Sequence, residues 1–276
     1  MFKGFSNSWA LVQAAWQVLQ QDKELLVFPI VSAFGVVLVS GVFAVPGFLV
    51  AASDNPAAQY AGYALAFLFY LVTYTVIFFA NAALVGAALI RLRGGDPTLG
   101  DGFSIAFSRL GAILGYALIS ATVGMILQML SEKNQIGKFV ANLLGSAWNI
   151  ATYLAVPILV VENVGPLEAV KRSVAYLKRT WGEQIVGNAG MGLVFGLLFF
   201  AVILAGGAGI FVALSLNLTP LVIGVIAIIV VVLILLALLN ATLTGIYTAA
   251  VYRFAVEGAT ESQFPAALVQ NTFRAK

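Results

Sequence analysis

Long apolar runs alternate with short polar connections along this chain. The runs at 221–239 and 60–90 match or exceed the roughly 20 residues that an α-helix needs to cross a hydrocarbon core of about 30 Å. Apolar runs bounded by charged residues or by Gly and Pro clusters predict six membrane spans. We expect these spans at 25–50, 60–90, 110–130, 139–161, 185–214 and 220–254.

The connection at 165–184, GPLEAVKRSVAYLKRTWGEQ, differs in character from the spans that flank it. Pro166 suits the first turn of a helix, and the next apolar residues follow at steps of three and four, which is an amphipathic pattern. This stripe is formed by Leu167, Val170, Val174, Leu177 and Trp181. Four basic residues, Lys171, Arg172, Lys178 and Arg179, lie off the stripe. The pattern predicts an interfacial helix that lies flat on the membrane.

Related segments precede the other hairpins. PTLGDGFSIAFSR at 97–109 aligns with the connection above at a constant offset, so that Pro97 matches Pro166 and Arg109 matches Lys178. Near the N-terminus a similar stripe contains Phe5, Trp9, Val12, Trp16 and Leu19. These segments predict three tandem, parallel units within one membrane domain, 1–276, each an interfacial helix followed by a two-span hairpin. The units are 1–95, 96–165 and 166–258, with a C-terminal interfacial segment at 259–276. Accidental similarity between basic amphipathic connections is the alternative.

Composition agrees with the spans. Hydrophobic residues make up 62% of the 276 positions and charged residues only 9%, against about 45–50% and about 25% in soluble domains. Barrel strands would alternate apolar and polar residues, which this chain does not do. We therefore expect an all-α integral membrane protein with six transmembrane helices. The first apolar run follows Asp22, Lys23 and Glu24, so it reads as an uncleaved anchor.

Basic residues are distributed unequally between the two predicted sides. The connections on one side contain nearly all of them, and only Lys133 and Lys138 stand opposite. Because cytoplasmic loops retain Lys and Arg, the pattern predicts a multi-pass protein of the cell inner (cytoplasmic) membrane with both termini in the cytoplasm. The residues on the basic side are Lys3, Lys23, Arg91, Arg93, Arg109, Lys171, Arg172, Lys178, Arg179, Arg253, Arg274 and Lys276.

Two segments also carry a family resemblance. PILVVENVGPLEAVKRSVAYLKRTWGEQIVG at 157–187 and SWALVQAAWQVLQQDKELLVFPIV at 8–31 resemble a broad group of bacterial and archaeal six-span proteins of unknown function. That group resembles the membrane domain attached to some glycerophosphodiester phosphodiesterases. The resemblance implies a six-span fold and brings no catalytic residues. Since no phosphodiesterase domain accompanies the spans, it does not imply hydrolysis of glycerophospholipids.

Polar side chains inside the spans are few and point to function or to helix contacts. They are Asn81, Asn149, Asn188, Asn240 and, at the end of the fourth span, Glu162, with Gln128 nearby. The spacing of Asn81, Asn149 and Asn240 allows a polar ring at one depth. Each asparagine either bonds a neighbouring helix or lines a path for a solute. For Glu162 we expect an ion pair with Arg172 or Arg109, or a helix cap.

Glycines four residues apart mark close helix packing. Gly111 and Gly115 share one face of the third span, and Gly192 and Gly196 share one face of the fifth. Such spacing lets helix backbones approach closely. We expect these faces to pack within the monomer or between subunits.

The sequence contains few residues that could carry out catalysis. The chain contains no cysteine and no histidine, which removes thiolate and imidazole chemistry and the commonest metal ligands. Asp96 and Asp101 sit beside Pro97 and Gly100, where turn and cap roles are expected. No other set of residues converges on a reaction. We therefore predict no enzyme activity, no catalytic residues, no metal, no cofactor and no nucleic-acid partner.

Two functions stay open. The first is a non-catalytic scaffold or accessory subunit, whose partners are anionic membrane lipids and other membrane proteins or a second copy of itself. Its headgroup contacts would be Lys171, Arg172, Lys178, Arg179 and Arg109. The alternative is a transporter or channel for a neutral or lipid-like solute, lined by the asparagines.

Overall fold

The computed structural model describes residues 2–181, 191–216, 218–258, 264–265 and 269. These residues form helices joined by short turns, with no strand among them. The helices are α1 (Phe2–Gln21), η1 (Lys23–Leu26), α2 (Val27–Ala51), α3 (Pro56–Leu92), α4 (Leu99–Ser108), α5 (Leu110–Lys133), α6 (Gln135–Ala151), α7 (Ala155–Val161), α8 (Pro166–Trp181), α9 (Gly192–Ser215) and α10 (Thr219–Glu257). Asn188 and the predicted start of the fifth span at 185 lie outside the described residues.

Six helical segments are long and apolar enough to cross a membrane, which confirms a multi-pass helical protein. They lie where the sequence predicts spans, and most extend a few residues further. Their bounds are Lys23–Ala51, Pro56–Leu92, Leu110–Lys133, Gln135–Val161, Gly192–Ser215 and Thr219–Glu257.

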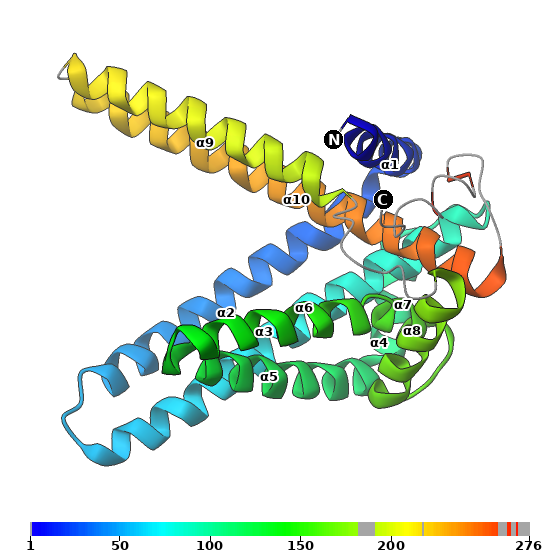
Figure 1. The fold of residues 1–276 in the computed structure, drawn as a ribbon, viewed down its shortest axis with the longest axis horizontal. Coiled ribbons are helices and arrows are strands. Elements are labelled where there is room, and N and C mark those ends of the chain that lie inside the picture. Colours follow the sequence, from blue (N-terminus) through cyan, green and yellow to red (C-terminus); the bar gives the residue numbers. More distant parts are fainter. Residues whose placement is uncertain (1, 182–190, 217, 259–263, 266–268, 270–276) are drawn as a thin grey trace.

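The long helices pair as three hairpins, α2 with α3, α5 with α6, and α9 with α10 (Figure 1). The α9–α10 hairpin diverges from the other two, so that the molecule opens like a V (Figure 1). The burial pattern of α10 agrees, because its buried residues begin only at Thr242. Its N-terminal half therefore adds no residue to the core.

The core lies at the closed end of the V, where the short helices gather. Between Ala80 and Leu92, α3 is almost entirely buried and rich in alanine, and it meets the buried half of α10 there. Small side chains let the helices approach closely: a Cβ on Gly245 would lie 2.3 Å from Leu84 Cδ2. Ala106 of α4 and Ala169 of α8 are also fully buried in this core.

The fourth span, predicted at 139–161, lies at Gln135–Val161 but is interrupted within its length. The helix stops at Ala151, turns, and restarts as α7 at Ala155. Pro157 explains the break, because its ring clashes with the carbonyl of Tyr153 and it has no N–H to donate to that carbonyl. Ser173 of α8 then accepts a hydrogen bond from the Leu154 N–H at 3.1 Å. The break is thus held by the helix that follows it.

The predicted stripe on α1 differs from its buried face. Trp9 and Trp16 are 45% and 42% exposed, whereas Leu11, Ala15 and Val18 are buried. The smaller side chains bring α1 close to α10 and α9, and the tryptophans point outward. Indole rings suit a membrane–water boundary, where one part of the ring is apolar and its N–H finds a polar partner.

The structure gives the surroundings of the four glycines for which the sequence predicts close helix packing. A Cβ on Gly115 would lie 3.0 Å from Pro166 Cγ, so Gly115 allows a close approach to the start of α8. For Gly111, Gly192 and Gly196 no described residue lies within 4 Å of that position, so the predicted close packing of these three, within the monomer or between subunits, stays a prediction. Tight approaches occur instead at Gly35, Gly86, Gly102, Gly206 and Gly245.

Candidate functional site

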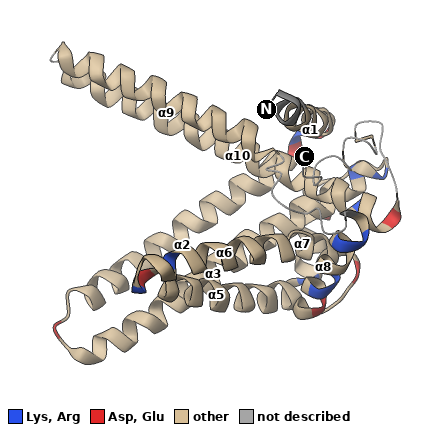
Figure 2. Cartoon of the chain, viewed as in Figure 1, with Lys and Arg blue, Asp and Glu red and all other residues tan. Residues whose placement is uncertain are grey.

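Charged side chains gather at the closed end of the V, where α4 and α8 lie, and the long arms are almost free of them (Figure 2). We call this end the rim: α4, α8, the α7–α8 connection and the C-terminal ends of α3 and α10. A smaller charged group, which includes Glu132, Lys133 and Lys138, lies at the α5–α6 turn. The rim and the intramembrane asparagines are the two candidate functional regions.

Glu162 is the centre of the largest polar cluster in the rim. Its side chain is only 12% exposed and lies 2.7 Å from Arg172 Nη1. The hydroxyls of Tyr176 and Tyr252 both donate to the same carboxylate, at 3.1 Å each. Arg172 also pairs with Glu168 at 3.0 Å. The cluster therefore joins the end of α7 to α8 and α10.

These contacts shift the titration of two rim groups. The hydrogen bond from Arg172 to Glu162 raises the pKa of that guanidinium above its ordinary value. Burial, and then the hydrogen bond to Glu162, raises the pKa of the Tyr176 hydroxyl. Both groups keep their protons at neutral pH and act as donors. The Glu162 carboxylate is an acceptor for three side chains, which suits structure better than proton transfer.

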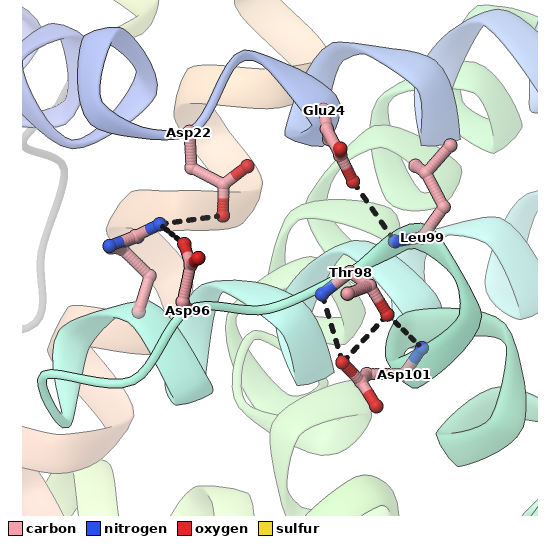
Figure 3. A network of polar contacts seen from close by, with 7 residues as sticks. Asp22, Glu24, Asp96, Thr98, Leu99 and Asp101 are labelled. Atoms are coloured by element: carbon pink, nitrogen blue, oxygen red, sulfur yellow. Dashed lines mark hydrogen bonds and ion pairs between the residues drawn. The ribbon is translucent and has the colours of Figure 1, made fainter.

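A second cluster ties η1 and the residue before it to the end of α3 and the loop before α4 (Figure 3). Arg91 pairs with Asp96 and lies 3.5 Å from Asp22, whose side chain is 4% exposed. Burial raises the pKa of Asp22, and the charge of Arg91 opposes that shift. Glu24 accepts a hydrogen bond from the Leu99 N–H at 3.1 Å. The acidic residues of this region thus serve as local partners.

Asp101 closes the N-terminus of α4, as its predicted cap role requires. Its carboxylate accepts from the Thr98 N–H at 2.9 Å, and the Thr98 hydroxyl accepts from the Asp101 N–H at 3.2 Å. This reciprocal pair is a capping box. The bond from the Thr98 N–H lowers the pKa of Asp101.

Three of the five predicted headgroup residues are bonded within the protein. Arg172 is held in the Glu162 cluster, Arg109 donates to Val160 O and Asn163 Oδ1, and Arg179 donates to Ala255 O at 2.7 Å. Asn163 has a φ of 53°, a left-handed conformation that asparagine tolerates better than most residues. These arginines fix the fold of the rim.

Lys171 and Lys178 differ from those arginines. Both are exposed on α8, and neither makes an ion pair or a hydrogen bond within the part of the chain that the structure describes. They lie two helical turns apart, so their side chains project from the same face. Lys171 and Lys178 thus form an exposed cationic pair on α8.

Asn81 and Asn240 line one cavity of about 520 Å³ between α2, α3 and α10. We call it the inter-arm cavity, because it lies where the α9–α10 hairpin separates from α2 and α3 (Figure 1). Ser32, Thr244 and Thr248 add hydroxyls to its wall, and none of the described residues that line it is ionisable.

Asn149 lies elsewhere, in a groove between α5 and α6 that it shares with Gln128. Of the three asparagines in the predicted ring, Asn81 and Asn240 therefore share one cavity, and Asn149 lines another. The sequence reading also missed Thr244 and Thr248. Their spacing from Asn240, in steps of four on one helix face, is a signal that would have found them.

Metal coordination has no candidate among the described residues, since no three His, Cys, Asp or Glu side chains there are grouped to share an ion. Catalytic carboxylates would need a free acid or base, and the acids of the rim described above are paired or serve as caps.

Residues 60–262 match a protein family described as a family of unknown function, DUF6159. The match covers α3 to α10, and thus most of the rim and most of the inter-arm cavity. Comparison with curated proteins finds none that matches the chain. The resemblance to the membrane domain of glycerophosphodiester phosphodiesterases stays an expectation. Because the matched segment is well over half of the chain, the chain belongs to this family of unknown function, DUF6159.

Proposed function

We propose that this protein is a non-catalytic integral membrane component, a scaffold or accessory subunit, that binds anionic lipid headgroups at its rim. One observation carries the proposal: Arg172 pairs with Glu162 and Arg179 donates to Ala255 O, while Lys171 and Lys178 stay exposed. A base that presents two lysines without a bonding partner among the described residues suits recognition of a phosphate-bearing surface. Each lysine near an anionic leaflet contributes about 1 kcal/mol.

The rim belongs at the cytoplasmic face in this proposal, with both termini on that side. The excess of Lys and Arg at the rim supports this orientation through the positive-inside rule. The order of the helices supports the three-unit scheme, because α1, α4 and α8 each precede one hairpin. Each short helix would then lie along the membrane surface and lead its hairpin into the bilayer.

The apolar arms are the surfaces for other membrane proteins or for a second copy of the chain. The N-terminal half of α10 has no buried residue, and the exposed side chains along α9 include Phe200, Leu204 and Phe211. Lipid tails solvate such surfaces without cost, so the arms need no partner to be stable. They leave ample area for helix contacts with a partner.

A transporter or channel for a neutral or lipid-like solute is the second candidate. The observation that favours it is the inter-arm cavity, which brings Asn81 and Asn240 to one uncharged space. The separate position of Asn149 weighs against a path lined by all three asparagines.

The rim proposal is tested with the double variant Lys171→Gln/Lys178→Gln. We expect its affinity for phosphatidylglycerol to fall about tenfold or more, since two charges of about 1 kcal/mol each are lost. Native mass spectrometry of the purified protein measures how much lipid stays bound. The matched control is Lys133→Gln/Lys138→Gln, which removes the same charge at the α5–α6 turn and should retain lipid as the wild type does. Equal retention by both variants would overturn the proposal.

A further inference from the structure

We propose that the inter-arm cavity binds an uncharged amphiphile of the diacylglycerol type, taken from the bilayer. This ligand and this site differ from the anionic headgroups proposed for the rim. The cavity has about 520 Å³ of space, within the range of about 300–1,000 Å³ that is usual for small-molecule sites.

The position of the cavity determines what can reach it. All of its walls belong to three candidate membrane spans, those that contain α2, α3 and α10. In a bilayer that these spans cross, the surroundings are lipid tails, and α10 diverges from α2 and α3 (Figure 1). An occupant must therefore have an apolar body that is already dissolved in the bilayer.

The walls of the cavity select against charge. Ile77, Leu84, Ile234 and Leu238 supply apolar surface, and none of the described lining residues is Lys, Arg, Asp or Glu. A phosphate or carboxylate here would lose its hydration without gaining a counter-charge, which costs far more than burying a neutral group. Phospholipid headgroups are therefore poor occupants, and uncharged headgroups are favoured.

Two carboxamides supply the polar recognition. Asn81 makes no hydrogen bond to another described residue, and its Oδ1 lies 3.7 Å from the place that a Cβ on Gly245 would take. Asn240 Oδ1 has one distant donor, Thr244 Oγ1 at 3.5 Å. An amide without a partner in hydrocarbon costs several kcal/mol, so these groups gain most from a ligand.

The hydrogen-bonding capacity of the cavity matches that of a diacylglycerol. Each carboxamide has two N–H donors and one accepting oxygen. Ester carbonyls accept from such donors, and a free hydroxyl donates to such an oxygen. A diacylglycerol carries both groups next to its acyl chains. A pure hydrocarbon would leave the asparagines unpaired, and a phospholipid would bring its phosphate.

The test uses full-length protein in mixed micelles that contain dioleoylglycerol, with binding measured by native mass spectrometry. Ala237→Trp places a large ring at the cavity wall, and Ala201→Trp places the same ring on the exposed face of α9 outside the cavity. We expect one dioleoylglycerol per wild-type chain, at least a tenfold loss of binding in Ala237→Trp, and no change in Ala201→Trp. Lys171→Gln/Lys178→Gln should also bind dioleoylglycerol as the wild type does. The experiment therefore distinguishes failure of the cavity proposal from failure of the rim proposal.

A second variant covers the case in which Ala237→Trp fails to fold. Asn81→Leu keeps the approximate volume and removes the carboxamide, so dioleoylglycerol binding should fall several-fold while phosphatidylglycerol at the rim is retained. A photoactivatable diacylglycerol should also label wild-type peptides from α2, α3 or α10. Unchanged binding in both Ala237→Trp and Asn81→Leu would overturn the proposal. So would labelling confined to other helices, preferred binding of phosphatidylglycerol in the cavity, or a dimer that Ala237→Trp abolishes.

Discussion

At the scale of single residues, Glu162 has the most connections in the rim. One carboxylate, at the point where α7 ends, accepts from Arg172, Tyr176 and Tyr252. These partners come from two other helices. When the protein folds, the Glu162 carboxylate therefore exchanges hydrogen bonds with water for three hydrogen bonds with protein side chains. Bonds to a charged group contribute about 1.5–3 kcal/mol each, more than bonds between neutral groups.

We predict that Glu162→Gln lowers the free energy of unfolding by about 2 kcal/mol, since the amide accepts weaker bonds and leaves Arg172 less well paired. Thermal unfolding of the detergent-solubilised protein, followed by tryptophan fluorescence, measures the loss. Glu168→Gln is the matched control, because Glu168 pairs with the same arginine but is about half exposed. Its cost should stay below about 0.5 kcal/mol, as for other exposed helical pairs. Equal costs for the two variants would contradict the central role of Glu162.

At the scale of helices, small residues decide which elements touch. The face of α4 that meets α3 contains Gly102 and Ala106, both buried. A Cβ on Gly102 would lie 2.4 Å from Phe28 Cζ and 2.9 Å from the backbone oxygen of Ala83. A side chain can move aside, but the backbone of a packed helix cannot easily do so. Gly102 is therefore required for α4 to rest on α3.

We predict that Gly102→Ala destabilises the protein by about 1–3 kcal/mol through overpacking. Gly196→Ala is the control, since a Cβ there meets nothing within 4 Å. In that open position alanine should be neutral or stabilising by up to about 1 kcal/mol, because it restricts the unfolded chain. The two melting temperatures, compared with the wild type, check the prediction. A drop for Gly196→Ala as large as that for Gly102→Ala would mean that α9 packs against a partner in the purified protein.

The helices illustrate what a hydrophobic pattern predicts well. Span length and apolar content located all six spans, because hydrocarbon accepts little else than long apolar helices. The break before α7 was missed, since Pro157 stands in an apolar run and its effect is local. The stripe of α1 did not show which of its residues are buried, because Leu11, Ala15 and Val18 form the buried face while Trp9 and Trp16 are exposed. A charged residue near the end of a span predicted its own contact more reliably: Glu162 pairs with Arg172, one of the two arginines expected from the sequence.

At the scale of the whole molecule, a rigid rim supports two diverging arms. The core holds α3 and the second half of α10 together, and the distal parts of these arms are exposed to the membrane. The pairing of Asn81 with Asn240 in one cavity follows from this divergence. No sequence pattern contains the angle between hairpins, because packing of side chains such as Leu84 against Gly245 sets it. This explains why the asparagines were found but their grouping was not.

The most direct test of the arrangement is the side of the membrane on which the rim lies. The chain contains no cysteine, so Lys178→Cys in the rim and Asp54→Cys at the α2–α3 turn each introduce a single thiol. A membrane-impermeant maleimide is added to intact cells, and labelling is compared before and after permeabilisation. We predict that Asp54→Cys reacts in intact cells and that Lys178→Cys reacts only after permeabilisation. Labelling of both thiols from the outside, or protection of both, would contradict a basic rim confined to the cytoplasmic surface.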